Sequence, residues 1–203
     1  MTIKTASLNS VSQRHVVSRR LTSVGATTAL AGEIAALVRS GDVIALGGGL
    51  GCGKTTFARA FIRALAALNG EGDPDEEVPS PTFTMVQIYE RRPAPIWHFD
   101  LYRVERPEES YELGIEEAFE SAISLVEWPQ NLGRLLPAER LDLDLEFSDE
   151  SDEDVPKSDI SESDNLENDA SGGPRLATLT GYRAWAGRLE GLESPLNHLT
   201  ERP

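Results

Sequence analysis

Residues 43–56 read Val-Ile-Ala-Leu-Gly-Gly-Gly-Leu-Gly-Cys-Gly-Lys-Thr-Thr, so a short apolar run of β type leads into the spacing Gly-x-x-x-x-Gly-Lys-Thr. Glycines let consecutive backbone N–H groups converge on an anion without Cβ clashes, and the following helix N-terminus adds unpaired donors. Lys54 would reach the β- and γ-phosphates of ATP, and the Thr55 hydroxyl would hold Mg²⁺. The stretch is therefore predicted to be a P-loop. Its predicted nucleotide-binding residues are Gly48, Gly49, Leu50, Gly51, Cys52, Gly53, Lys54, Thr55 and Thr56.

Other glycine motifs do not fit this stretch. No Gly-x-Gly-x-x-Gly pattern can be drawn through residues 47–53, which disfavours a Rossmann dinucleotide site and a protein-kinase loop.

Two acids close apolar strands further along the chain. Asp100 follows the β-type run 96–99, and Glu127 follows the run 123–126. In an open α/β sheet, ligands bind outside the carboxyl ends of the strands, so both carboxylates should face the phosphates. One should complete the Mg²⁺ shell with Thr55, and the other could orient or deprotonate the attacking water.

Composition limits the class of protein. Residues 148–174 hold ten acids and one base, and the remainder has 24 acids and 18 bases, a net charge of −6 against −15 for the whole chain. A mildly acidic folded part argues against a large nucleic-acid face, so any contact with RNA should run through a partner. A single cysteine fits a reducing compartment, and no apolar stretch approaches a membrane span. A cytoplasmic protein is expected.

The order of helical and β-type patterns predicts a single α/β domain of the P-loop NTPase kind, with a mostly parallel central sheet and flanking helices. Helices are expected at residues 26–39 and 55–68. Residues 140–147 alternate Leu or Phe with Asp or Glu, which is typical of a strand near a sheet edge. We expect a disordered N-terminal tail (1–20), the ATPase domain (21–147), an acidic disordered insertion (148–174), and a final strand and helix that complete the same domain (175–203).

Three further strings follow the P-loop in order: Ser-Pro-Thr-Phe-Thr at 80–84, His-Phe-Asp-Leu-Tyr-Arg at 98–103, and Leu-Val-Glu-Trp-Pro at 125–129. Together they closely resemble the TsaE (YjeE) family, small bacterial P-loop ATPases that support threonylcarbamoyl modification of adenosine in tRNAs reading ANN codons. The resemblance runs from about residue 27 to residue 147, with a fainter match after residue 176.

The resemblance implies roles for individual residues. It places the magnesium ligands on Thr55 and Glu127, the catalytic aspartate on Asp100, and a mobile switch-like segment on residues 80–84. Lys54 is expected to assist catalysis as well as binding. A family threonine ahead of the first helix, which contacts the base end of the nucleotide, aligns with Thr27. The implied partners are TsaB-like and TsaD-like proteins, which ATP hydrolysis would reset between rounds of threonylcarbamoyl transfer.

The chain departs from the family pattern at two loop positions. Gly49 replaces a usual acid and Cys52 a usual alanine; phosphate binding should survive, with Cys52 either packing as a small apolar side chain or acting as a reactive thiol. Trp128 and Tyr102 could be interface anchors or core residues, Arg103 could pair with Asp100, and His98 reads as structural. Two other functions stay open: a P-loop kinase for a small metabolite, and a nucleotide-dependent assembly factor with incidental hydrolysis.

Overall fold

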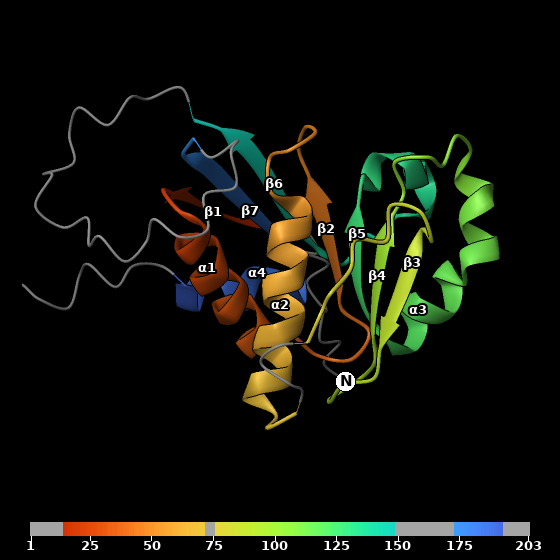
Figure 1. The fold of residues 1–203 in the computed structure, drawn as a ribbon, viewed down its shortest axis with the longest axis horizontal. Helices are drawn as coiled ribbons and strands as arrows, with labels where there is room; N and C mark the ends of the chain where they lie inside the picture. The colour runs from red at the N-terminus through yellow and green to blue at the C-terminus, as the bar shows by residue number, and fades with distance from the viewer. Residues whose placement is uncertain (1–13, 72–75, 149–172, 193–203) are drawn as a thin grey trace, which may run out of the picture.

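A seven-stranded mixed sheet forms the centre of the molecule, in the order β1-β7-β6-β2-β5-β4-β3 (Figure 1). The computed structural model describes residues 14–71, 76–148 and 173–192. The strands are β1 (Arg14–Leu21), β2 (Val43–Gly47), β3 (Val86–Tyr89), β4 (Ile96–Asp100), β5 (Ile123–Glu127), β6 (Leu141–Phe147) and β7 (Arg175–Tyr182). The α-helices are α1 (Val24–Leu37), α2 (Lys54–Leu68), α3 (Ile115–Ser121) and α4 (Ala184–Leu189), and 3₁₀ segments cover Pro107–Leu113, Pro129–Leu135 and Glu190–Leu192.

The central strands are parallel and the outer ones antiparallel. β2 pairs in parallel with β5 and β6, and β4 pairs in parallel with β5. The antiparallel strands lie at the two edges of the sheet, β3 at one and β7 and β1 at the other. The predicted α/β fold class is therefore confirmed. The parallel arrangement brings the carboxyl ends of β2, β4, β5 and β6 to the same end of the sheet. Ligands bind beyond these strand ends in such folds.

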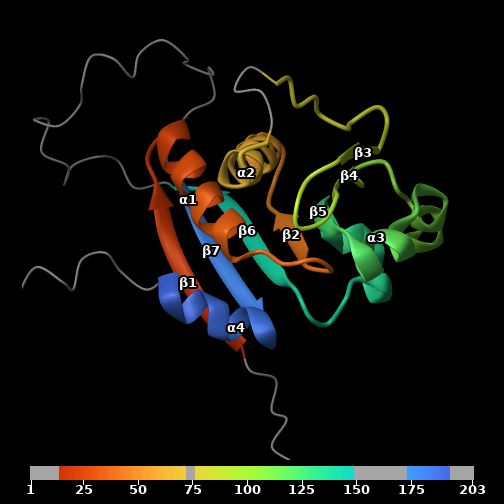
Figure 2. The same ribbon diagram turned by 90° about the horizontal axis from the view of Figure 1, so that it is seen from below.

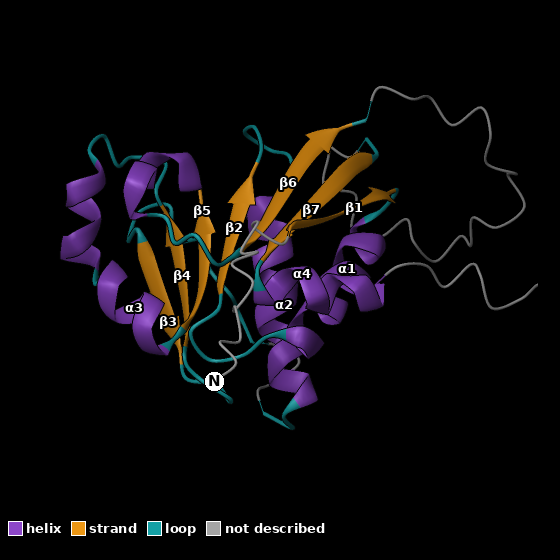
Figure 3. Ribbon diagram, turned by 180° about the vertical axis from the view of Figure 1, so that it is seen from behind, coloured by secondary structure: helices purple, strands orange, loops and turns teal. Residues whose placement is uncertain are grey.

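Helices cover the two faces of the sheet unequally. One core joins α1, α2 and α4 to the sheet, with Ile34, Phe57 and Trp185 fully buried in it. A second core packs Ile115 and Ala118 of α3 against the other face, and α3 lies toward the β3–β4 end (Figures 2 and 3). No helix within the described ranges is both long and apolar enough to cross a bilayer.

The N-terminal expectation was wrong for residues 14–20. They belong to β1, which pairs with β7 from Arg14 opposite Tyr182 to Leu21 opposite Arg175. Alternate β1 residues are exposed, so the segment has too few apolar residues to stand out by composition, and only its pairing with β7 makes it a strand. Residues 1–13 of the expected tail lie outside the described residues.

The position expected for the 140–147 strand was also wrong. β6 is an interior strand between β7 and β2. Leu141, Leu143 and Leu145 are buried in the α1–α2 core, whereas Asp142 and Asp144 lie on the opposite face and line a pocket. The alternation of apolar and acidic residues in β6 therefore indicates that one face of the strand is buried and the other is accessible to solvent. It does not indicate an edge strand.

The flanks of the expected acidic insertion meet each other. Residues 149–172 lie outside the described residues, but Phe147 faces Arg175 across β6 and β7, and the Ser148 amide donates to the Pro174 carbonyl at 2.8 Å. The two strands therefore already form a paired end, to which a tight turn could be attached.

Replacing residues 149–172 with a short Asn-Gly turn is expected to leave the thermal midpoint unchanged or raised by a few degrees. The entropic cost of closing a connection between two paired strands falls by about 0.6 kcal/mol for each halving of its length. Differential scanning calorimetry tests this. A control deletion that also removes Phe147 and Arg175 should lower the midpoint, and a comparable loss in the first variant would contradict the prediction.

Candidate functional site

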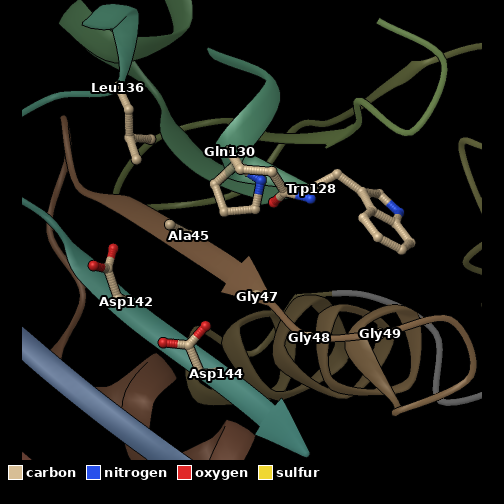
Figure 4. A pocket seen from close by; sticks show the side chains of 10 residues that line it. Ala45, Gly47, Gly48, Gly49, Trp128, Gln130, Leu136, Asp142 and Asp144 are labelled. Carbon is tan, nitrogen blue, oxygen red and sulfur yellow. The ribbon is translucent and has the colours of Figure 1, made fainter. Parts of the chain in front are cut away.

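The predicted P-loop, residues 48–55, joins β2 to α2. Figure 4 shows Gly47 at the carboxyl end of β2, with Gly48 and Gly49 following it into the loop. Lys54 is the first residue of α2, and Gly53 precedes it with a φ of 108°. The segment therefore has the strand, loop and helix order that phosphate binding at a helix N-terminus requires.

Glycine is required at some loop positions and not at others. Gly48, Gly51 and Gly53 have φ values of 117°, 76° and 108°, which side chains with a Cβ rarely adopt. A Cβ on Gly48 would also lie 2.2 Å from the Leu145 carbonyl oxygen, whereas a Cβ on Gly49 would meet nothing within 4 Å. The acid that is usual at Gly49 in the family would thus have room here.

Lys54 points back into the loop. Its side chain is 5% exposed, and its Nζ donates to the carbonyl oxygens of Gly48 at 2.9 Å and Gly49 at 2.7 Å. The ammonium also lies 3.9 Å from the centre of the Trp128 ring, a cation–π distance. Lys54 is therefore held inside the loop by neutral groups, which phosphate oxygens could replace with stronger charge-assisted bonds.

Thr55 and Glu127 lie together as predicted for a magnesium-binding pair. The Thr55 hydroxyl donates to Glu127 Oε2 at 3.0 Å, and Glu127 is 2% exposed. No cluster of three or more His, Cys, Asp or Glu side chains in the described residues could hold a metal by itself. Two oxygen ligands fit Mg²⁺, which usually takes one or two protein ligands and completes its shell with phosphate oxygens and water.

Asp100 lies beside Glu127, because the two residues face each other at the ends of β4 and β5. Both Asp100 oxygens accept hydrogen bonds: Oδ1 from the Tyr102 amide at 3.1 Å, and Oδ2 from the Thr82 hydroxyl at 2.8 Å. The expected switch segment, residues 80–84, therefore contacts the predicted catalytic carboxylate directly. Sequence reasoning identified both partners but not this bond.

Aromatic residues surround the site. Trp128 has a φ of 59°, which is rare for a bulky residue, and its ring lies 5.0 Å from that of Tyr102, which is 56% exposed. Arg103 lies over the ring of Phe83, at 5.1 Å. Trp128 therefore contacts Lys54 of the predicted P-loop, and Arg103 contacts Phe83 of the predicted switch segment.

Cys52, Thr27 and His98 were also singled out in the sequence. Cys52 is 1% exposed and belongs to the main core, consistent with a small apolar role. Thr27 lies inside α1, and its hydroxyl donates to the Ser23 carbonyl at 3.4 Å; its contact with the base end of the nucleotide stays a prediction. His98, read as structural, contacts Glu127 through Nε2 at 2.9 Å. The sequence does carry a clue to this role of His98. It lies two residues before Asp100, and residues two apart on a strand share a face.

A pocket of about 460 Å³ lies beside the start of the loop (Figure 4). Its lining is Ala45, Gly47, Gly48, Gly49, Trp128, Pro129, Gln130, Leu136, Asp142 and Asp144. Asp144 is more than a third exposed, but partial loss of its hydration in the pocket, reinforced by the neighbouring charges of Asp142 and Glu146, raises the pKa of its carboxyl. By contrast, Asp142 accepts from Arg140 Nε at 2.6 Å and Nη2 at 3.0 Å.

Asp144→Asn is expected to raise the thermal midpoint by no more than about 1 °C at pH 7, because the side chain is more than a third exposed and solvent screens its interactions. A raised pKa means that the folded state disfavours the ionised carboxyl, so stability is lost as pH rises through the folded pKa. The gain should vanish below about pH 4, where the carboxyl is protonated in both states. Thermal unfolding across pH measures this. Asp142→Asn, which breaks the Arg140 pair, should lower the midpoint; a loss for Asp144→Asn at pH 7 would refute the prediction.

The fold and site define an α/β protein with a phosphate-type glycine loop between a buried strand and a helix. The family model "Threonylcarbamoyl adenosine biosynthesis protein TsaE" matches residues 21–155. The chain therefore belongs to the TsaE family, which takes part in tRNA threonylcarbamoyladenosine biosynthesis.

Individual relatives agree with this assignment. The tRNA threonylcarbamoyladenosine biosynthesis protein TsaE of Rickettsia bellii is 36% identical over 64% of this chain and 86% of its own length. The protein of the same name from Bacillus subtilis is 40% identical over 58% of this chain and 69% of its own length. A crystal structure of Bacillus subtilis YdiB superposes with a TM-score of 0.63 at 25% identity, covering 88% of this chain and 95% of that one.

Proposed function

We propose that this chain is a Mg²⁺-dependent ATPase that supports threonylcarbamoyl modification of adenosine in tRNAs reading ANN codons. One observation carries the proposal. Lys54, Thr55, Asp100 and Glu127 meet beyond the carboxyl ends of the central strands, around a loop whose glycines have positive φ values. Membership of the TsaE family supplies the biological context.

The side chains divide the chemistry between them. Lys54 would bind the β- and γ-phosphates, while Thr55 and Glu127 would hold Mg²⁺, which neutralises charge on the phosphate oxygens when bound. Asp100 would orient the attacking water or accept its proton. Its Oδ2 accepts a hydrogen bond from the Thr82 hydroxyl, so Thr82 would compete with the attacking water for that oxygen and lower its basicity. We therefore expect low basal hydrolysis.

The partners would be TsaB-like and TsaD-like proteins of the transferase complex, in the cytoplasm, with tRNA contacted only indirectly. Phe83 of the switch segment is 83% exposed next to Thr82, so a partner that covered Phe83 could reposition the Thr82 hydroxyl. Partner binding and release of Asp100 would then be coupled through one short segment.

Phosphate release is the measurement that tests this proposal. We expect a low rate for the purified chain, an increase of several-fold with the TsaB–TsaD pair, and no dependence on a small-molecule acceptor. Stimulation by a metabolite acceptor without protein partners would instead indicate a kinase.

Asp100→Asn should still bind ATP and join the complex, yet lose phosphate release and repeated tRNA modification, because the amide cannot accept the proton from water. Glu116→Gln, on the exposed side of α3, is the matched loss of one acid and should behave as wild type. Full multiple-turnover modification by Asp100→Asn would remove hydrolysis from the mechanism and favour an assembly factor.

A further inference from the structure

The Glu127 carboxylate is held from two sides. Thr55 donates its hydroxyl to Oε2 at 3.0 Å, and His98 lies 2.9 Å from Oε1 through Nε2. His98 is 0% exposed and Glu127 is 2% exposed, so water does not compete freely for either bond. The terminal torsion of a glutamate has a broad energy minimum, so a carboxylate is oriented mainly by its hydrogen bonds.

The His98 ring makes this bond with a defined nitrogen. Its Nδ1 is buried and has no hydrogen-bond partner among the described residues. A carboxylate that binds Mg²⁺ only accepts hydrogen bonds, so in the proposed site Nε2 carries the hydrogen that is donated to Glu127. A side chain that served packing alone would avoid the cost of an unpaired buried nitrogen, so the bond to Glu127 is the specific contribution of histidine here.

Strand register makes this contact possible. His98 faces Leu125, and Asp100 faces Glu127, across the parallel β4–β5 pair. Residues two apart on a strand share a face, so His98 lies one step below Glu127 on the face that carries α2. The His98 ring therefore contacts Oε1 of Glu127. The other carboxylate oxygen, Oε2, faces Thr55 at the N-terminus of α2.

We infer that His98 is a positioning residue for the magnesium site, whose Nε2–H fixes the Glu127 carboxylate so that Oε2 is presented to the metal beside Thr55. The inference rests on the proposed Mg-ATP function and names a residue that acts on the metal through Glu127. Hydrogen-bond partners of metal ligands typically change metal affinity by 10- to 100-fold when removed.

The test measures ATP binding by titration calorimetry at a series of Mg²⁺ concentrations and in EDTA. His98→Leu removes the donor, and the Mg²⁺ concentration for half-maximal enhancement of ATP binding should rise about 10- to 100-fold. His98→Gln can place an amide N–H near the Nε2 position, and should stay within about 3-fold of wild type. Affinity in EDTA should be equal for all three proteins. Glu127→Ala is the reference for loss of the ligand itself.

A purely structural role for His98 predicts a different pattern. The leucine and glutamine variants would then lose thermal stability without a change in Mg²⁺ dependence, and this result would overturn the inference. Equal Mg²⁺ dependence of His98→Leu and wild type would do the same. If His98→Leu does not fold, His98→Asn replaces it, because the shorter amide cannot reach Glu127.

A metal-free measurement separates this inference from the proposed function. The nitrogen NMR spectrum of His98 should show the hydrogen on Nε2 in the wild-type protein, with a shifted Nε2 resonance in Glu127→Ala. A hydrogen on Nδ1 alone would overturn the inference. A wild-type protein that shows the Nε2 hydrogen but no Mg²⁺-dependent ATP binding would instead refute the magnesium role of the pair and the proposed function with it.

Discussion

Lys54→Ala is expected to weaken Mg-ATP binding by at least about 10-fold, because it removes the charge that would bind the β- and γ-phosphates. About 1.4 kcal/mol of lost charge-assisted bonding produces that factor. The structure shows the ammonium inside the loop, 2.7 Å from the Gly49 carbonyl and 3.9 Å from the Trp128 ring centre. Isothermal titration calorimetry measures the change.

Two controls make the Lys54 result specific. Arg63→Ala removes one positive charge from the same helix, where the guanidinium contacts only the Glu76 carbonyl in the described hydrogen bonds, and should leave affinity unchanged. The thermal midpoint without nucleotide shows whether losing the Lys54 bonds to Gly48 and Gly49 disturbs the fold. Unchanged affinity in a folded Lys54→Ala protein would contradict the P-loop assignment.

Gly48→Ala should lower the thermal midpoint by about 5–10 °C and weaken ATP binding by at least about 10-fold. A non-glycine residue at the φ of 117° costs about 1–3 kcal/mol, and about 1 kcal/mol corresponds to 2–4 °C in a protein of this size. The new Cβ would lie 2.2 Å from the backbone oxygen of Leu145, so the loop and β6 would have to move apart. That movement would displace the N–H groups meant for phosphate.

Gly49→Ala is the matched control, because its Cβ would meet no atom within 4 Å and its backbone is not in the positive-φ region. We expect its midpoint and its ATP affinity to lie within about 1 °C and twofold of wild type. Calorimetric unfolding and ATP titration of both variants test the pair. Equal behaviour of the two alanine variants would show that the glycine geometry of the loop is not what binding requires.

Much of the candidate site could be predicted because its information is local. The spacing of Gly53, Lys54 and Thr55 after an apolar run determines a loop that opens a helix. Asp100 and Glu127 could be placed at strand ends by their position after short apolar runs, and parallel pairing then put them side by side. The exact bounds of each element differ by a few residues, since helix and strand ends depend on capping and pairing.

The contacts that complete the site could not be read in the same way. The bonds from Thr82 to Asp100 and from His98 to Glu127 join residues 18 and 29 positions apart, and each depends on the register of β4 with a neighbouring segment. The cation–π contact of Lys54 with Trp128 likewise requires the left-handed backbone of Trp128, for which the sequence carries no glycine signal.

Residue spacing and periodicity encode local conformation, so the glycine loop, the acids that end β4 and β5, and the α/β class can be predicted from the sequence. The folded protein was needed to see that residues 14–21 form a strand, that β6 is interior, and that His98 contacts Glu127. These features arise from pairing between distant segments. Their free energy comes from burial and hydrogen bonds that exist only once the sheet is assembled.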